Sequence, residues 1–273
     1  MTTHVEELVY RSIGNRQLKA LIFSPDGSAA KQRKSPAIVC LHGGAWITGD
    51  RRVPAYMAEK LAERGFVVMS IDFRMAPRHQ YPSSLLDINY AIRWLRQNAY
   101  NFDVNPDAIG GLGFSSGGHL ILLSAMRPAW DVYTADLPDE LRHVSAELDW
   151  VVTLSGVLDP LARYRMAQQA GYADIIACHD KYFGNEENMR EGNPPLILER
   201  KEKVTLPPLL MFQGGDDPRL PPDMATRVAE LYLEAGGEAE ALVYPGQGHA
   251  LSEWPEALQE EIADRIQVFA TQV

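Results

Sequence analysis

The stretch Ile109-Gly110-Gly111-Leu112-Gly113-Phe114-Ser115-Ser116-Gly117-Gly118-His119-Leu120 places a serine between an apolar segment and an amphipathic one. G-x-S-x-G between a strand and a helix is the pattern of a nucleophile elbow, in which the serine occupies a very sharp turn. Side chains two residues before and after that serine would clash, so glycine is expected at Gly113 and Gly117. The turn is predicted to lift the Ser115 hydroxyl clear of the sheet and to direct the helix N-terminus at a reacting carbonyl.

Composition indicates one large globular domain over residues 1–273, since the 273 residues are 46% hydrophobic and 23% charged. The net charge of -10 argues against nucleic acid and anionic membranes as partners. With only two cysteines, Cys40 and Cys178, the sequence implies no disulfide framework and no cysteine-based metal site. The first residues lack a basic segment followed by an apolar one, and no apolar run reaches the ~18 residues of a membrane span. A cytoplasmic protein is therefore predicted.

Apolar runs typical of buried strands alternate with amphipathic segments typical of helices. The predicted strands cover residues 5–11, 17–23, 36–41, 66–71, 150–154, 208–213 and 239–244, besides the apolar segment before Ser115. The predicted helices cover residues 53–64, 83–98, 116–126, 222–235 and 255–271. Asn105-Pro106-Asp107 is expected to form a turn into the strand that ends at Phe114. This alternation predicts an α/β fold with a mostly parallel sheet and helices on both faces.

Two stretches are less regular. Residues 127–148 hold scattered aromatic, proline and acidic residues, and residues 156–205 have mixed character. Both are candidates for insertions that form a small cap over the site, and ordinary connecting helices are the alternative.

Polar residues gather where predicted strands end, and in parallel sheets the active groups lie at these carboxyl ends. His42-Gly43-Gly44-Ala45-Trp46, Ser115, Asp216-Asp217 and His249 follow four different strands. The chain order is therefore serine, acid, histidine.

Ser115 is the predicted nucleophile, and because a serine hydroxyl is barely ionised at neutral pH it needs a base within hydrogen-bond reach. His249, in a glycine-rich loop, is the predicted base, since an imidazole with a pKa of ~6.5 both accepts and returns a proton near pH 7. Asp217 is expected to orient His249, with Asp216 as its neighbouring rival and Asp159 as a weaker alternative.

An oxyanion hole needs backbone N–H groups directed at the developing negative charge. One donor should be the N–H of Ser116, and others should come from the glycine loop at 43–45. His42 is expected to hold this loop and Trp46 to pack beneath it. His119, one helical turn after Ser115, is too constrained to meet the serine and is expected to support the site or pack in the core.

The segments His42-Gly43-Gly44-Ala45-Trp46, Asp72-Phe73-Arg74-Met75-Ala76-Pro77 and Gly113-Phe114-Ser115-Ser116-Gly117-Gly118-His119 resemble those of α/β-hydrolase carboxylesterases of the hormone-sensitive-lipase and acetyl-esterase type. The resemblance extends over residues 35–271. It implies an eight-stranded sheet and a serine ester hydrolase for small or medium acyl esters, with no metal and no cofactor. Carried over, the catalytic triad falls on Ser115, Asp217 and His249. The oxyanion donors fall on Gly44, Ala45 and Ser116.

This chain departs from that pattern at two positions. Ala45 replaces the third glycine of the usual loop, and Phe114 replaces the common Asp before the serine. Little sequence precedes residue 36, so the long N-terminal cap of the lipase-like branch is not expected. These features resemble compact acetyl- or feruloyl-esterases and also kynurenine formamidase, which shares a His-Gly-Gly-x-Trp loop.

Three functions therefore follow from the sequence. The first is a serine carboxylesterase acting on a small-molecule ester. The second is an amidase or formamidase with the same triad, and the third is a hydrolase-fold protein that binds a ligand without catalysis. A homodimer is left open.

Overall fold

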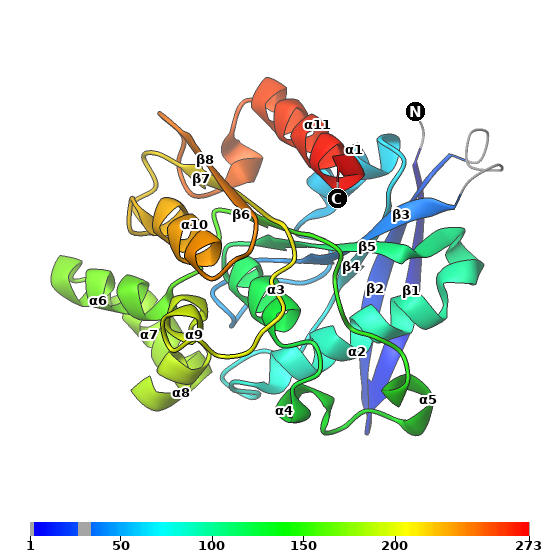
Figure 1. The fold of residues 1–273 in the computed structure, drawn as a ribbon, viewed down its shortest axis with the longest axis horizontal. Coiled ribbons are helices and arrows are strands. Elements are labelled where there is room, and N and C mark those ends of the chain that lie inside the picture. The colour runs from blue at the N-terminus through cyan, green and yellow to red at the C-terminus, as the bar shows by residue number, and fades with distance from the viewer. Residues whose placement is uncertain (1–2, 27–33, 273) are drawn as a thin grey trace.

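A computed structural model describes residues 3–26 and 34–272, and their strands form one eight-stranded sheet in the order β1-β2-β4-β3-β5-β6-β7-β8 (Figure 1). Strands β3 to β8 run parallel to one another, whereas β1 and β2 are antiparallel to their neighbours. The strands are β1 Thr3–Ile13, β2 Arg16–Pro25, β3 Ser35–Leu41, β4 Val67–Ile71, β5 Val104–Phe114, β6 Val151–Leu154, β7 Leu209–Gly214 and β8 Ala239–Tyr244. The mostly parallel sheet predicted from the sequence is confirmed.

Helices cover both faces of this sheet. Figure 1 shows α1 (Ala55–Glu63) and α11 (Glu256–Gln272) on one side, and α2 (Ser83–Gln97), α3 (Ser116–Met126) and α10 (Met224–Glu234) on the other. The remaining helices are α4 Asp131–Thr134, α5 Asp139–Arg142, α6 Pro160–Ala170, α7 Ala173–Phe183, α8 Glu186–Glu191 and α9 Pro194–Glu199. No helix in these described ranges has the length and apolar character needed to cross a bilayer.

Strand β3 shows why the central strands are apolar without interruption. Successive side chains of a strand point to opposite faces, and Val39 and Leu41 enter one hydrophobic core while Ile38 and Cys40 enter the other. Both faces are buried beneath helices, so no position on this strand favours a polar residue.

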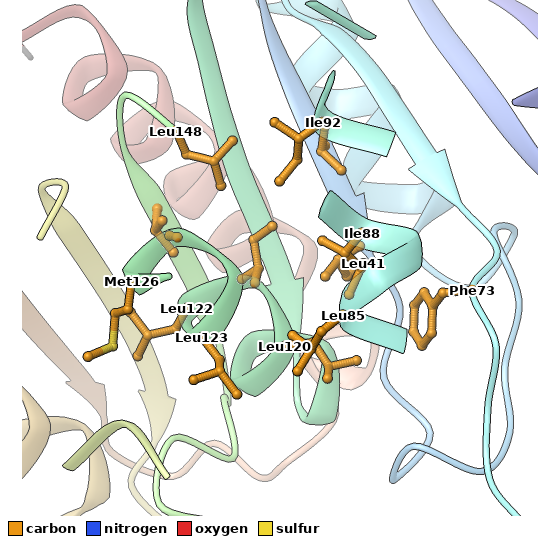
Figure 2. Close-up of a cluster of buried hydrophobic side chains, with 14 of the residues drawn as sticks. Leu41, Phe73, Leu85, Ile88, Ile92, Leu120, Leu122, Leu123, Met126 and Leu148 are labelled. Carbon is orange, nitrogen blue, oxygen red and sulfur yellow. The ribbon is translucent and has the colours of Figure 1, made fainter. Parts of the chain in front are cut away.

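The core between α2, α3 and the sheet sets the position of the elbow helix (Figure 2). Leu85, Ile88 and Ile92 of α2 belong to the same core as Leu120 and Leu123 of α3, and all five are fully buried. Burying each such side chain contributes about 1.5–3 kcal/mol of transfer free energy. Apolar packing therefore holds α3, and the turn at its start, against the sheet.

One local prediction differs from the structure. Asn105, Pro106 and Asp107, predicted as a turn, lie within the bounds of β5. The register between β3 and β5 shifts there, from Ser35↔Val104 to Ala37↔Ile109. Proline has no N–H to donate to a ladder, so this part of β5 bulges away from regular pairing.

The two irregular stretches occupy different places. Residues 127–148 contain α4 and α5 and pack against α2, where the Arg93 guanidinium donates to the Pro128 carbonyl at 3.1 Å and that of Arg96 to the Ser145 carbonyl at 2.6 Å. Residues 156–205 contain α6 to α9, which group together between β6 and β7 in the chain (Figure 1). The second group contacts the glycine loop after β3 through α7, where Tyr182 stacks on Trp46.

Candidate active site

The backbone at Ser115 is strained in the way the sequence predicts. Ser115 has φ 50° and ψ -116°, a backbone region that residues other than glycine rarely adopt. A Cβ at Gly113 would lie 2.3 Å from the Gly117 carbonyl oxygen, and one at Gly117 would lie 2.5 Å from the His42 carbonyl oxygen. The Ser115 N–H donates to the Leu154 carbonyl at 2.9 Å, which fixes the turn to the end of β6. Glycine on both sides is therefore a steric requirement of the turn.

The three predicted triad side chains form one chain of hydrogen bonds. Ser115 Oγ lies 2.8 Å from His249 Nε2, and His249 Nδ1 lies 2.7 Å from Asp217 Oδ2. A carboxylate only accepts hydrogen bonds, so Nδ1 carries the hydrogen and Nε2 is free to accept from the serine. The other carboxylate oxygen of Asp217 accepts from the Arg219 N–H at 2.7 Å. The Asp217 carboxylate is fully buried, whereas the His249 ring is 18% exposed.

The rival acids lie elsewhere. Asp216 is exposed. Asp159 caps α6, where its Oδ1 accepts from the Ala162 N–H and from the Asn193 side chain, each at 2.8 Å. Of the three candidate acids, the structure brings only Asp217 to His249.

The glycine loop after β3 forms a tight turn whose backbone lies in the left-handed region. Gly44, Ala45 and Trp46 have φ of 111°, 51° and 63°. The Ile47 and Thr48 N–H groups both donate to the Gly44 carbonyl, at 3.0 and 3.1 Å. A Cβ at Gly44 would lie 1.9 Å from the Thr48 carbonyl oxygen, so only glycine fits there.

A hydrogen bond joins this turn to the elbow helix. Gly44 and Ala45 lie within the turn, and Ser116 is the first residue of α3. The Trp46 N–H donates to Ser116 Oγ at 3.2 Å. At the start of the loop, His42 Nδ1 donates to the Gly43 carbonyl at 2.6 Å, and the His42 ring stacks on Phe73.

Helix α7 contributes aromatic residues that the sequence reasoning missed. The Trp46 indole is 1% exposed and stacks on Tyr182, with ring centroids 5.2 Å apart and planes 7° apart. Phe183 and His179 meet the same indole edge-on. His179 is fully buried beside these rings. The spacing of His179, Tyr182 and Phe183 on one helical face was the available signal.

Three buried histidines near the glycine loop are held neutral. Burial lowers the pKa of His119 to about 4 and that of His179 to about 3, against opposing contributions from hydrogen bonds to backbone carbonyls. Burial also lowers the pKa of His42. These imidazoles act as neutral hydrogen-bonding groups, whereas His249 alone of the four contacts Ser115.

The BD-FAE family model matches residues 22–231 of this chain. The chain belongs to the BD-FAE family. The match spans the glycine loop, the elbow and Asp217, and it ends before β8 and His249. The BD-FAE assignment therefore rests on most of the sheet and on three of the four strand ends that form this site.

Named relatives agree with this family. Esterase LipC of Mycobacterium tuberculosis is 29% identical over 88% of this chain and 59% of its own length. A probable isoprenylcysteine alpha-carbonyl methylesterase, ICMEL1 of Arabidopsis thaliana, is 25% identical over 78% of this chain and 45% of its own length. The BD-FAE chain thus spans about half the length of the curated relatives it matches.

Solved esterase structures cover nearly the whole chain. The esterase Est2 of Thermogutta terrifontis, solved with propionate bound, matches with a TM-score of 0.76 and 27% identity over 97% of this chain and 93% of its own. The same esterase phosphonylated by sarin matches with a TM-score of 0.77 and 26% identity over 97% and 94%. The α/β-hydrolase fold and the resemblance to carboxylesterases, both predicted from the motifs, are confirmed.

Proposed function

We propose that this chain is a serine carboxylesterase that cleaves esters of small or medium acyl chains through an acyl-enzyme intermediate. The observation that carries the proposal is the unbroken hydrogen-bonded chain from Ser115 through His249 to Asp217 at a strained elbow. The named esterases among the relatives and the solved structures support the same class of reaction.

In the proposed first step, His249 Nε2 takes the hydroxyl proton as Ser115 Oγ attacks the ester carbonyl carbon. Asp217, fully buried and hydrogen-bonded to Nδ1, holds the ring in the required tautomer and stabilises the imidazolium that forms. His249 then gives the proton to the departing alcohol as the carbon–oxygen bond breaks. Water repeats the sequence on the acyl-enzyme and releases the acid.

The negative charge on the carbonyl oxygen would be stabilised by the N–H groups of Gly44, Ala45 and Ser116. The positive φ values at Gly44 and Ala45 support this role, because successive N–H groups in tight turns often form an anion-binding concavity. Ser116 begins an eleven-residue helix, whose N-terminus favours the same charge.

Helices α6 to α9 are proposed as the small cap, because α7 packs on the loop that carries Gly44 and Ala45. Residues 127–148 are the weaker candidate, since they pack against α2. A single domain and a cytoplasmic location stay predictions of the sequence, which leaves a homodimer open.

Hydrolysis of p-nitrophenyl acetate by the purified chain and by Ser115→Ala tests the proposal. Wild type should turn the ester over and react once with a fluorophosphonate probe, whereas Ser115→Ala should lose ~10⁴-fold or more in kcat. The matched control is Ser12→Ala, at an exposed serine on β1 that takes no part in this hydrogen-bonded chain. Full turnover by a folded Ser115→Ala variant would reject Ser115 as the nucleophile.

A series of p-nitrophenyl esters from acetate to decanoate, run beside an aryl formamide, tests the substrate class. The proposal expects the highest kcat/KM among the shorter esters. Faster cleavage of the formamide than of any ester would instead identify the amidase alternative.

A further inference from the structure

Two hydrogen bonds from the start of α3 reach the loop that carries the proposed oxyanion donors. The Trp46 backbone N–H donates to Ser116 Oγ, and the Trp46 indole Nε1–H donates to His119 Nδ1, both at 3.2 Å. Ser116 and His119 are one helical turn apart and so lie on the same side of α3. The helix therefore holds both the main chain and the side chain of Trp46.

The second ring nitrogen of His119 forms a hydrogen bond outside this loop. His119 Nε2 lies 2.7 Å from the Gly192 carbonyl, between α8 and α9. An indole N–H only donates, so Nδ1 accepts, and Nε2 carries the hydrogen given to Gly192. His119 is fully buried, and burial keeps its pKa low enough to preserve this neutral tautomer at neutral pH.

Trp46 needs such support because its backbone is strained. A bulky residue with φ of 63° is an outlier that persists only where its surroundings enforce it. The indole is 1% exposed and stacks on Tyr182, so packing fixes the plane of the ring. The bond to His119 adds a directional contact at the indole N–H, which stacking on Tyr182 does not supply.

We propose that His119 is a positioning residue for the oxyanion loop. Its two ring nitrogens hold the Trp46 indole against α3 and join that loop to the junction between α8 and α9. The inference rests on the proposed function, and it goes beyond it by making the oxyanion loop depend on a side chain that touches neither substrate nor triad.

The test separates the two hydrogen bonds of the imidazole, the one to Trp46 and the one to Gly192. His119→Phe removes both bonds and keeps an aromatic ring. His119→Asn places an amide oxygen near the Nδ1 position and can still accept from the indole, whereas His119→Gln places its amide nearer Nε2 and serves the Gly192 arm. Exposed His143→Phe is the matched control.

His119→Phe should lower kcat ~10- to 100-fold with little change in KM, because a displaced donor weakens the transition state more than the ground state. His119→Asn should recover most of this loss and His119→Gln little of it. The affinity for a trifluoromethyl ketone, whose serine adduct carries an oxyanion, should fall in parallel with kcat/KM. The pH profile set by His249 should not move.

Trp46→Phe gives an independent measurement, since it deletes the indole N–H and keeps a ring on Tyr182. If His119 acts through Trp46, this variant should lose about as much kcat as His119→Phe. The double variant should then lose no more than either single one, because both remove the same bond.

All assays are run below the melting temperature of every variant, so that a purely structural role appears as lower thermal stability alone. A His119→Phe enzyme with wild-type kcat and inhibitor affinity would overturn the inference, and so would losses that add in the double variant. If His119→Phe does not fold, His119→Asn, His119→Gln and Trp46→Phe decide the question. Failure of the proposed function looks different, since wild type itself would then neither hydrolyse esters nor react with the fluorophosphonate.

Discussion

Two buried tryptophans support the glycine loop after β3 and the loop that carries His249. They lie on opposite faces of the sheet. Trp46 belongs to the core beneath α2 and α3, and Trp254 to the core beneath α1 and α11. The Trp254 indole donates at 3.0 Å to the carbonyl of Gly248, the residue before His249. The Trp46 indole donates to His119, on a helix far along the chain.

The tryptophan that supports the His249 loop is close to it in sequence, whereas the partners of Trp46 are distant. The His249 loop is held by Trp254, which lies six residues after its partner Gly248. The His249 ring is 18% exposed. The Trp46 loop is held by residues of α3 and α7 that are separated from it by long stretches of sequence. We therefore expect changes in α7, α8 and α9 to disturb the glycine loop that carries Trp46 more than they disturb the His249 loop.

The largest expected effect lies on the His249 side. Asp217→Asn should lower kcat by ~10⁴-fold, because an amide opposite Nδ1 favours the wrong imidazole tautomer. Its matched control is Asp216→Asn at the exposed neighbour, which should keep kcat within about 3-fold. Steady-state kinetics on p-nitrophenyl acetate measures both variants. Equal losses at the two positions would contradict the assignment of the acid.

The next effect distinguishes the two tryptophans. Trp46→Ala and Trp254→Ala should each lower the free energy of unfolding by about 3–5 kcal/mol, because both remove a buried indole and leave a cavity. Tyr100→Ala, at a side chain that is 82% exposed, should change it little. Hydrogen exchange in α8 and α9 should rise in Trp46→Ala only. A rise of the same size in Trp254→Ala would show that the two loops do not differ in this way.

Gly44→Ala should lower kcat by ~10²–10³-fold, the range expected when one oxyanion donor is displaced. The new Cβ would lie 1.9 Å from the Thr48 carbonyl oxygen, so the turn must open. Gly14→Ala is the control, since Gly14 also has a positive φ of 56° but a Cβ there meets nothing within 4 Å. That control should lose only stability, about 1–2 kcal/mol, and its kcat should be that of wild type.

The smallest effect concerns the pH dependence of stability. The folded pKa of His119 is lowered to about 4 from 6.5, so below pH 6.5 the unfolded chain takes up a proton that the folded chain does not. Stability is therefore lost as the pH falls from 6.5 to 4, by about 3 kcal/mol for this residue. In urea unfolding at pH 7 and pH 4, His119→Asn should show a smaller loss than wild type by that amount. His143→Asn, an exposed control, should keep the wild-type difference.

Much of the fold could be predicted because local patterns carry it. Uninterrupted apolar runs such as residues 36–41 require burial on both faces, and alternation with helical segments then favours a parallel sheet. The bulge near Pro106 was not predicted, since it depends on where β3 begins beside β5. The individual helices α6 to α9 were not predicted either. Their sequence mixes polar and apolar residues without a clear period, and which of their faces are buried depends on their neighbours in the fold.

The sequence by itself determined the residue types of the site and their order, because each one follows a strand whose carboxyl end must lie at one edge of the sheet. It also determined glycine at Gly113 and Gly117, since the turn that carries Ser115 leaves no space for a Cβ. The sequence favoured Asp217 over Asp216, and only the tertiary structure showed that the Asp217 side chain is the one directed at His249. The tertiary structure alone revealed that His119 joins Trp46 to Gly192, because hydrogen bonds between segments far apart leave no periodic signal in the chain.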